Sequence, residues 1–114
     1  MNIVVQGTKS FSDYTVFLRA MSVAMSDHKG TEINVFSVGP VKTNAMVAEF
    51  CNKAEGSLKA RGVKIKFVLV PESEVEKRIK DMNYFILLSM PNERITRLAI
   101  IADKAKVEVG HFRY

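Results

Sequence analysis

The sequence of 114 residues contains no tryptophan, one cysteine and no long apolar run. The single cysteine, Cys51, excludes an intrachain disulfide, and its position on an apolar helix face suits a small buried side chain better than a reactive thiol. No segment approaches the ~18–20 consecutive apolar residues that a membrane-spanning helix needs. The N-terminus also lacks a basic segment followed by an apolar stretch and a cleavage site. We therefore expect a cytoplasmic protein with no membrane partner.

Residues that bind metals or perform catalysis are also scarce. The two histidines are His28, in a predicted loop, and His111, near the C-terminus, and neither belongs to a helical histidine pair or a cysteine cluster. Asp13, Glu93 and Asp103 are single carboxylates without a visible partner, and such groups are more often helix caps or surface charges. The sequence therefore predicts no metal site, no cofactor and no catalytic residue.

The composition is that of one ordinary folded domain. Hydrophobic residues make up 47% and charged residues 25% of the chain, so we interpret residues 1–114 as a single domain. Lysine and arginine number 17 against 12 aspartate and glutamate, which gives a net charge of +5. Such an excess attracts nucleotides, nucleic acids or acidic protein surfaces. Because the basic residues are dispersed, they are more typical of a solvated surface than of a nucleic-acid site.

Short apolar runs alternate along the chain with segments of helical periodicity. Strands are predicted at residues 1–6, 33–38, 63–67, 84–88 and 107–112. Helices are predicted at residues 12–26, 43–60, 73–82 and 94–104. This alternation predicts one three-layer α/β domain, with a mostly parallel five-stranded sheet and helices on both faces.

Local patterns add three details to this fold. Lysines alternate with apolar residues in the strand at 63–67, which indicates a position near a sheet edge. The continuous apolar run at 84–88 is the best candidate for the centre of the sheet. Ser73 and Glu76 have the spacing of a capping box at the start of the third helix.

The segment from Gly7 to Asp13 lies where the first strand leads into the first helix, and parallel α/β proteins bind ligands at such positions. Gly7 allows the backbone to turn without a Cβ clash. Ser10 and Asp13 have capping-box spacing. Lys9 adds a cation beside a helix N-terminus, which itself favours anions. The alternative interpretation is a well-formed turn with no ligand.

Residues 7–14, which read Gly-Thr-Lys-Ser-Phe-Ser-Asp-Tyr, resemble the opening signature of the small SLOG proteins. That signature usually reads Gly-Ser-Arg-Asp-Phe-Thr-Asp-Tyr. SLOG domains are Rossmann-like nucleotide-binding modules, related to the cytokinin-activating phosphoribohydrolases and to the DNA-processing protein A core. Residues 35–50 are similar to the family's next strand, glycine-rich loop and helix. The resemblance implies a Rossmann-like fold and a nucleotide or nucleotide-derived ligand.

The chain departs from the family in its later loops. The second loop has fewer glycines than the family pattern, although Lys42 supplies charge, and Thr43 and Asn44 supply polar groups for a ligand or for capping. The third loop has no Gly-Thr pair to hold a phosphate. The Pro-Gly-Gly-x-Gly-Thr-x-x-Glu segment of the family's glycosidases is absent. The resemblance therefore implies binding without catalysis.

Three strand-to-helix loops, at residues 7–13, 39–44 and 89–96, are expected at one sheet edge. The candidate ligand-binding residues are Gly7, Thr8, Lys9, Ser10, Phe11, Asp13, Gly39, Pro40, Lys42, Thr43, Asn44, Ser89 and Thr96. A phosphate is expected between the first two loops, with Lys9 and Lys42 as countercharges.

Two other functions are consistent with the sequence. One is an interaction or assembly protein, such as a homo-oligomer, that keeps the fold without the ligand site. The other is single-stranded nucleic-acid binding, suggested by the net charge and by the similarity to the DNA-processing core.

Overall fold

Strands and helices alternate along the chain, as the apolar pattern predicts. The computed structural model describes residues 1–26 and 30–113, so the loop predicted around His28 lies outside the described residues. The strands are β1 (Asn2–Gly7), β2 (Glu32–Ser37), β3 (Lys64–Leu69), β4 (Tyr84–Ser89) and β5 (Glu108–Arg113). The helices are α1 (Tyr14–Met25), α2 (Val41–Ala60), α3 (Glu72–Lys77), the 3-10 turn η1 (Ile79–Asp81) and α4 (Arg97–Lys104).

All five strands run parallel in one sheet with the order β3-β2-β1-β4-β5. β3 lies at an edge, which confirms the prediction from its alternating lysines. The prediction that residues 84–88 form the centre is wrong, because β1 is the middle strand and β4 lies between β1 and β5. Every residue of β4 is nevertheless buried, since α1 and α4 contact it from opposite faces. A continuous apolar run therefore indicates coverage of both faces rather than the middle position.

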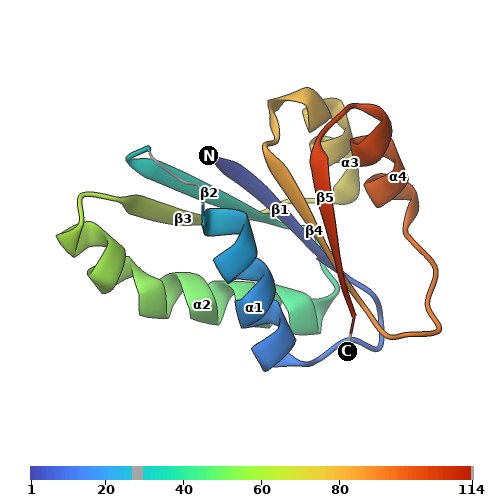
Figure 1. Ribbon diagram of the computed structural model, residues 1–114, viewed down its shortest axis with the longest axis horizontal. Helices are drawn as coiled ribbons and strands as arrows, with labels where there is room; N and C mark the ends of the chain where they lie inside the picture. Colours follow the sequence, from blue (N-terminus) through green and yellow to red (C-terminus); the bar gives the residue numbers. More distant parts are fainter. Residues whose placement is uncertain (27–29, 114) are drawn as a thin grey trace.

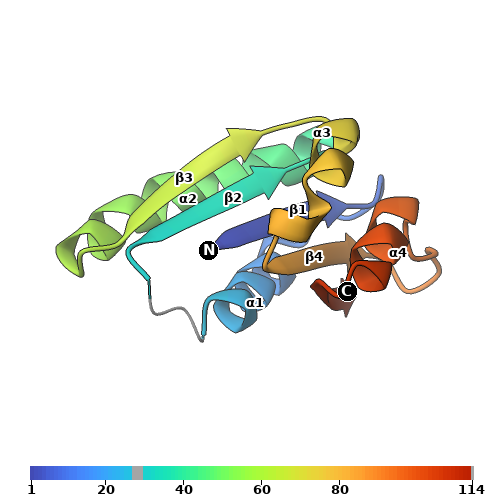
Figure 2. The same ribbon diagram turned by 90° about the horizontal axis from the view of Figure 1, so that it is seen from above.

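Helices cover both faces of the sheet, which confirms the α/β fold class (Figure 1). α1 and α2 pack against one face, where Phe17 of α1 meets Ile86 of β4 in one apolar core. On the other face, Leu98 of α4 and Phe85 of β4 belong to a second core. Figure 2 shows α3 and α4 gathered over the β1–β4 side of the sheet, whereas α2 lies behind β2 and β3.

The start of α1 is fixed by one capping side chain. The Asp13 carboxylate accepts a hydrogen bond from the backbone N–H of Val16 at 3.0 Å, so the helix begins at Tyr14 rather than at residue 12. Ser10 lies outside the helix. The capping box predicted for Ser10 and Asp13 is therefore wrong, because Asp13 itself is the cap.

The starts of α3 and α4 also differ from the predictions. α4 begins at Arg97, with Thr96 as its cap, instead of at residue 94. α3 follows Pro71 and has no side-chain cap, so the capping box predicted for Ser73 and Glu76 does not form. Glu76 instead binds Arg97, with Oε1 and Nη1 at 2.8 Å, and thereby joins α3 to α4.

The parallel sheet places the carboxyl ends of all five strands at one edge, which is at the lower right in Figure 1. We call the segments that leave β1, β2 and β4 there the first loop (residues 8–13), the second loop (residues 38–40) and the third loop (residues 90–96). Of the described helices, none combines the length and the apolar character that crossing a membrane requires.

Candidate functional site

The three loops contact one another at the carboxyl edge of the sheet. The backbone N–H of Gly7 donates to the carbonyl of Gly39 at 3.1 Å, which joins the end of β1 to the second loop. The backbone N–H of Thr8 donates to the carbonyl of Leu88 at 2.8 Å, and the Thr8 hydroxyl donates to the Glu93 carboxylate in the third loop. The structure therefore brings the three predicted loops together in one surface.

Gly7 is needed for close packing rather than for a turn. It ends β1 without a left-handed backbone, so the expected role in turning the chain is corrected. A Cβ at this position would lie far inside van der Waals contact with Thr43 Oγ1, and only 3.1 Å from Thr43 Cβ. Thr43 is wholly buried, and its hydroxyl has no hydrogen-bond partner within the described structure. Glycine at position 7 therefore allows α2 to approach β1.

The N-terminus of α2 is open to an anion. The helix begins at Val41, two residues before the predicted start, and no side chain caps it. The amides of residues 41–43 precede the first intrahelical hydrogen bond, from the N–H of Asn44 to the carbonyl of Pro40 at 2.9 Å. The first turn contains no acidic residue, and Lys42 is exposed. Amide donors, the helix dipole and a lysine therefore all favour a negative group at this point.

Gly39 and Asn44 shape the second loop. Gly39 has a φ of 97°, in the left-handed region that favours glycine. Asn44 lies inside the first turn of α2 and does not cap it. Its Oδ1 accepts a hydrogen bond from the hydroxyl of Ser37 at 2.6 Å. This bond joins the end of β2 to the start of α2.

Glu93 places a carboxylate among the donors of the first and third loops. It accepts hydrogen bonds from the Thr8 hydroxyl and from the backbone N–H of Met90, the latter at 2.7 Å. These two bonds, with a smaller effect of the Ser10 backbone N–H, lower the pKa of the Glu93 carboxyl below its ordinary value. Glu93 is therefore firmly ionised at neutral pH. This contact could not be predicted from local sequence patterns, because 85 positions separate Glu93 from Thr8.

A pocket of about 340 Å³ opens beside the first loop and is lined by Ser10, Ser12, Asp13 and Met90. It lies between the first and third loops, whereas the phosphate was expected between the first and second. Lys9 is exposed on the first loop. The surface of the edge thus carries a cation, two serines and one capping carboxylate.

Four of the predicted ligand residues are buried: Gly7, Phe11, Thr43 and Ser89, the last three of which are each 0% exposed. Phe11 anchors the first loop in the core of the α1–α2 face. The Ser89 hydroxyl forms a hydrogen bond with the ring of His111, which is half-buried. Burial, and secondly the charge of Arg113, lower the pKa of His111, so the ring is neutral at pH 7. Burial therefore corrects the predicted ligand contact of these four positions to a supporting role.

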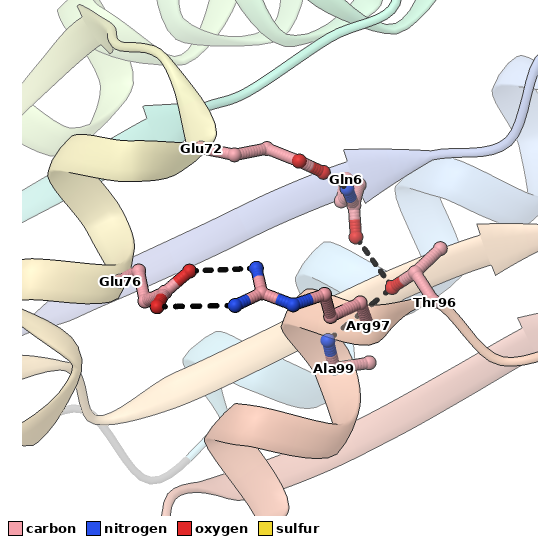
Figure 3. A network of polar contacts seen from close by, with 6 residues as sticks. All are labelled: Gln6, Glu72, Glu76, Thr96, Arg97 and Ala99. Atoms are coloured by element: carbon pink, nitrogen blue, oxygen red, sulfur yellow. Dashed lines mark hydrogen bonds and ion pairs between the residues drawn. The ribbon is translucent and has the colours of Figure 1, made fainter.

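Thr96 belongs to a polar network on the α3–α4 side of the sheet, drawn in Figure 3. Its hydroxyl donates to Gln6 Oε1 at 2.6 Å and accepts from the backbone N–H of Ala99 at 3.2 Å. Gln6 in turn donates from Nε2 to the carboxylate of Glu72. These bonds attach the starts of α3 and α4 to β1. Gln6 was not among the predicted site residues. A polar residue in an apolar strand nevertheless indicates a buried side chain that needs a hydrogen-bond partner.

Replacing Thr96 with alanine is expected to lower the free energy of unfolding by about 1–2 kcal/mol. The change removes the cap of α4 and leaves Oε1 of the nearly buried Gln6 without its donor. Ser12→Ala, at an exposed serine of the first loop, is the matched control and should change stability by less than ~0.5 kcal/mol. Urea unfolding of both variants measures the difference, and equal values would contradict the role of the network.

A larger hollow, of about 520 Å³, lies at the opposite edge of the sheet near the end of α2. It is lined by Glu32, Glu55, Lys59, Val63, Lys64, Ile65 and Lys66. Two carboxylates there offset most of the charge of three lysines, and the C-terminal end of a helix repels anions. The carboxyl edge is therefore the better place for an anionic ligand, despite its smaller pocket.

The described residues supply neither a reactive thiol nor a cluster of metal ligands at the carboxyl edge. Cys51 is buried, which confirms the sequence prediction, and burial raises the pKa of its thiol to about 11. Within residues 1–26 and 30–113, no three histidine, cysteine, aspartate or glutamate side chains gather closely enough to hold a metal ion.

Comparisons of this chain with protein-family models, with curated proteins and with solved structures give no match. A function is therefore inferred from the geometry of the site, because a fold alone does not specify one.

Proposed function

We propose that the protein binds a nucleotide or nucleotide-derived ligand at the carboxyl edge, as a SLOG-like module that does not turn the ligand over. The observation that carries the proposal is the uncapped N-terminus of α2, a helix of 20 residues that begins beside the first loop. The unbonded amides of the exposed residues 41 and 42 and the side chain of Lys42 receive a phosphate group. The resemblance of residues 7–14 to the SLOG signature supports a nucleotide over other anions.

The first loop supplies the second part of the site. Lys9 is exposed there, and the bond between Gly7 and Gly39 holds this loop against the second one. The adjacent pocket, lined by Ser10 and Met90 among others, has room for part of a ligand beyond its phosphate. The phosphate group and the rest of the ligand are therefore bound by neighbouring parts of the carboxyl edge.

Binding without catalysis agrees with the positions of the polar side chains. Ser89 and His111 are hydrogen-bonded in the manner of a nucleophile and a base, but Ser89 is wholly buried and out of reach of a substrate. The Asp13 carboxylate is engaged in capping α1. These groups stabilise the fold around the site.

A thermal-shift titration with a panel of nucleotides tests the proposal. A nucleotide at about 100 times its Kd adds about 2.7 kcal/mol of stability, which raises the Tm of a small domain by roughly 10 °C. Lys9→Ala should reduce the shift, whereas Lys104→Ala, at the far end of α4, should leave it unchanged. Absence of any shift across the panel would contradict the proposal. A stable oligomer, or salt-dependent binding of single-stranded DNA, would then favour the assembly or the nucleic-acid function.

A further inference from the structure

The Glu93 carboxylate of the third loop is bound by donors of the first loop. The Thr8 hydroxyl and the Met90 backbone N–H both donate to the Glu93 carboxylate, and the Ser10 backbone N–H stabilises the same charge. Ser10 and Met90 also line the adjacent pocket. Donors from two loops thus converge on one carboxylate, where the bonds from Thr8 and Met90 both end on Oε1, and such a group of donors also suits a phosphate oxygen.

We propose that Glu93 is an internal occupant of the ligand site and that the phosphate group of an incoming ligand displaces it. This inference rests on the proposed function, because it concerns the same edge and the same class of ligand. Carboxylate and phosphate oxygens need the same donors, and two anions at close range repel each other. A ligand therefore binds the small fraction of molecules in which Glu93 has left, which lowers its apparent affinity.

Displacement has a consequence for specificity. A phosphate ion that takes the place of Glu93 gains only the donors that Glu93 gives up, whereas a nucleotide with a phosphate there also contacts the pocket beside Ser10 and the start of α2. The carboxylate therefore selects for larger anions over free phosphate. Displacement of Glu93 would also change the contacts of the third loop, which ends at Thr96, the cap of α4.

The simpler role for Glu93 is to hold the third loop closed. Its backbone N–H donates to the carbonyl of Met90 at 3.1 Å, so the side-chain bond to Met90 reinforces an existing turn. The two roles differ in their effect on binding. A loop staple leaves phosphate affinity unchanged or lowers it when removed, whereas an occupant raises the affinity when removed.

Calorimetric titration with inorganic pyrophosphate separates the two roles. Glu93→Gln removes the charge at the site and is expected to raise the affinity about tenfold. Glu72→Gln is the matched control, since it removes the same charge at the same sheet edge and keeps an acceptor for Gln6. It should change the affinity less than about twofold, because exposed charges are screened by salt. Similar increases in both variants would mean a general charge effect and would overturn the proposal.

Nuclear magnetic resonance titration of the Glu93 carboxyl in the wild-type protein gives a second readout that needs no variant. Saturating pyrophosphate should raise the lowered pKa of Glu93, because the carboxylate loses its donors. Binding with an unchanged Glu93 pKa would overturn the displacement and leave the proposed function intact. Absence of binding to the wild type and to Glu93→Gln alike would overturn both.

Discussion

Replacing Gly7 with alanine is expected to lower the free energy of unfolding by about 3 kcal/mol. The new Cβ would overlap Thr43 Oγ1 and lie 3.1 Å from Thr43 Cβ, and a buried β-branched side chain next to a strand has little room to move. Relief requires α2 to move away from β1, which also separates the first and second loops. Urea unfolding measures the loss of stability, and nucleotide affinity should fall with it.

Two further variants identify the cause of that loss. Gly56→Ala makes the same substitution on the exposed face of α2, where a Cβ meets nothing within 4 Å, and should raise stability by about 0.5–1 kcal/mol. Thr43→Ala removes the overlapping hydroxyl, so the double variant Gly7→Ala, Thr43→Ala should be more stable than the sum of the single effects predicts. Additive effects would show that Thr43 does not exclude a side chain at position 7.

Reversing the charge of Lys42 is expected to weaken nucleotide binding by at least about tenfold. A glutamate there removes one charge-assisted hydrogen bond and adds repulsion to a phosphate at the start of α2. The substitution should not unfold the protein, because a carboxylate in the first turn of a helix is stabilising by about 0.3–1 kcal/mol. Isothermal titration calorimetry with ADP measures the affinity, and urea unfolding verifies the stability.

Lys59→Glu is the control for net charge. It lies in the last turn of the same helix, and 17 residues at 1.5 Å per residue place it roughly 25 Å from Lys42. That distance is more than twice the screening length of ~8 Å at physiological salt, so the affinity should change less than about twofold. Equal losses in the two variants would mean that net charge, and not the start of α2, attracts the nucleotide.

The alternation of elements could be predicted because its signals are local. Residues 33–38 form a nearly continuous apolar run, and Phe17, Ala20 and Met21 recur at helical spacing. The order of strands could not be predicted in the same way. β1 and β4 are both apolar, and the central place of β1 depends on which crossovers the chain makes. Helix starts were uncertain because Ser10 and Asp13 both have capping side chains.

Only the local features of the candidate site could be predicted, because contacts between distant segments leave no local signal. The first loop carries its polar residues in one short segment, so its exposure beside a helix start could be expected from spacing. Contacts between loops could not, because Gly7 with Thr43 and Thr8 with Glu93 are distant in the sequence. Gln6 is different, since a buried polar residue in an apolar strand requires a partner and could have been noted.

The most direct test of a phosphate site at the carboxyl edge is an amide chemical-shift titration of isotope-labelled protein with ADP. Saturable changes are predicted at the amides of residues 8–10 and 41–43, which belong to the first loop and the start of α2. The amides of residues 59–66, around the larger hollow at the opposite edge, should not move. Changes confined to residues 59–66, or none at ~1 mM ADP, would contradict the proposed site.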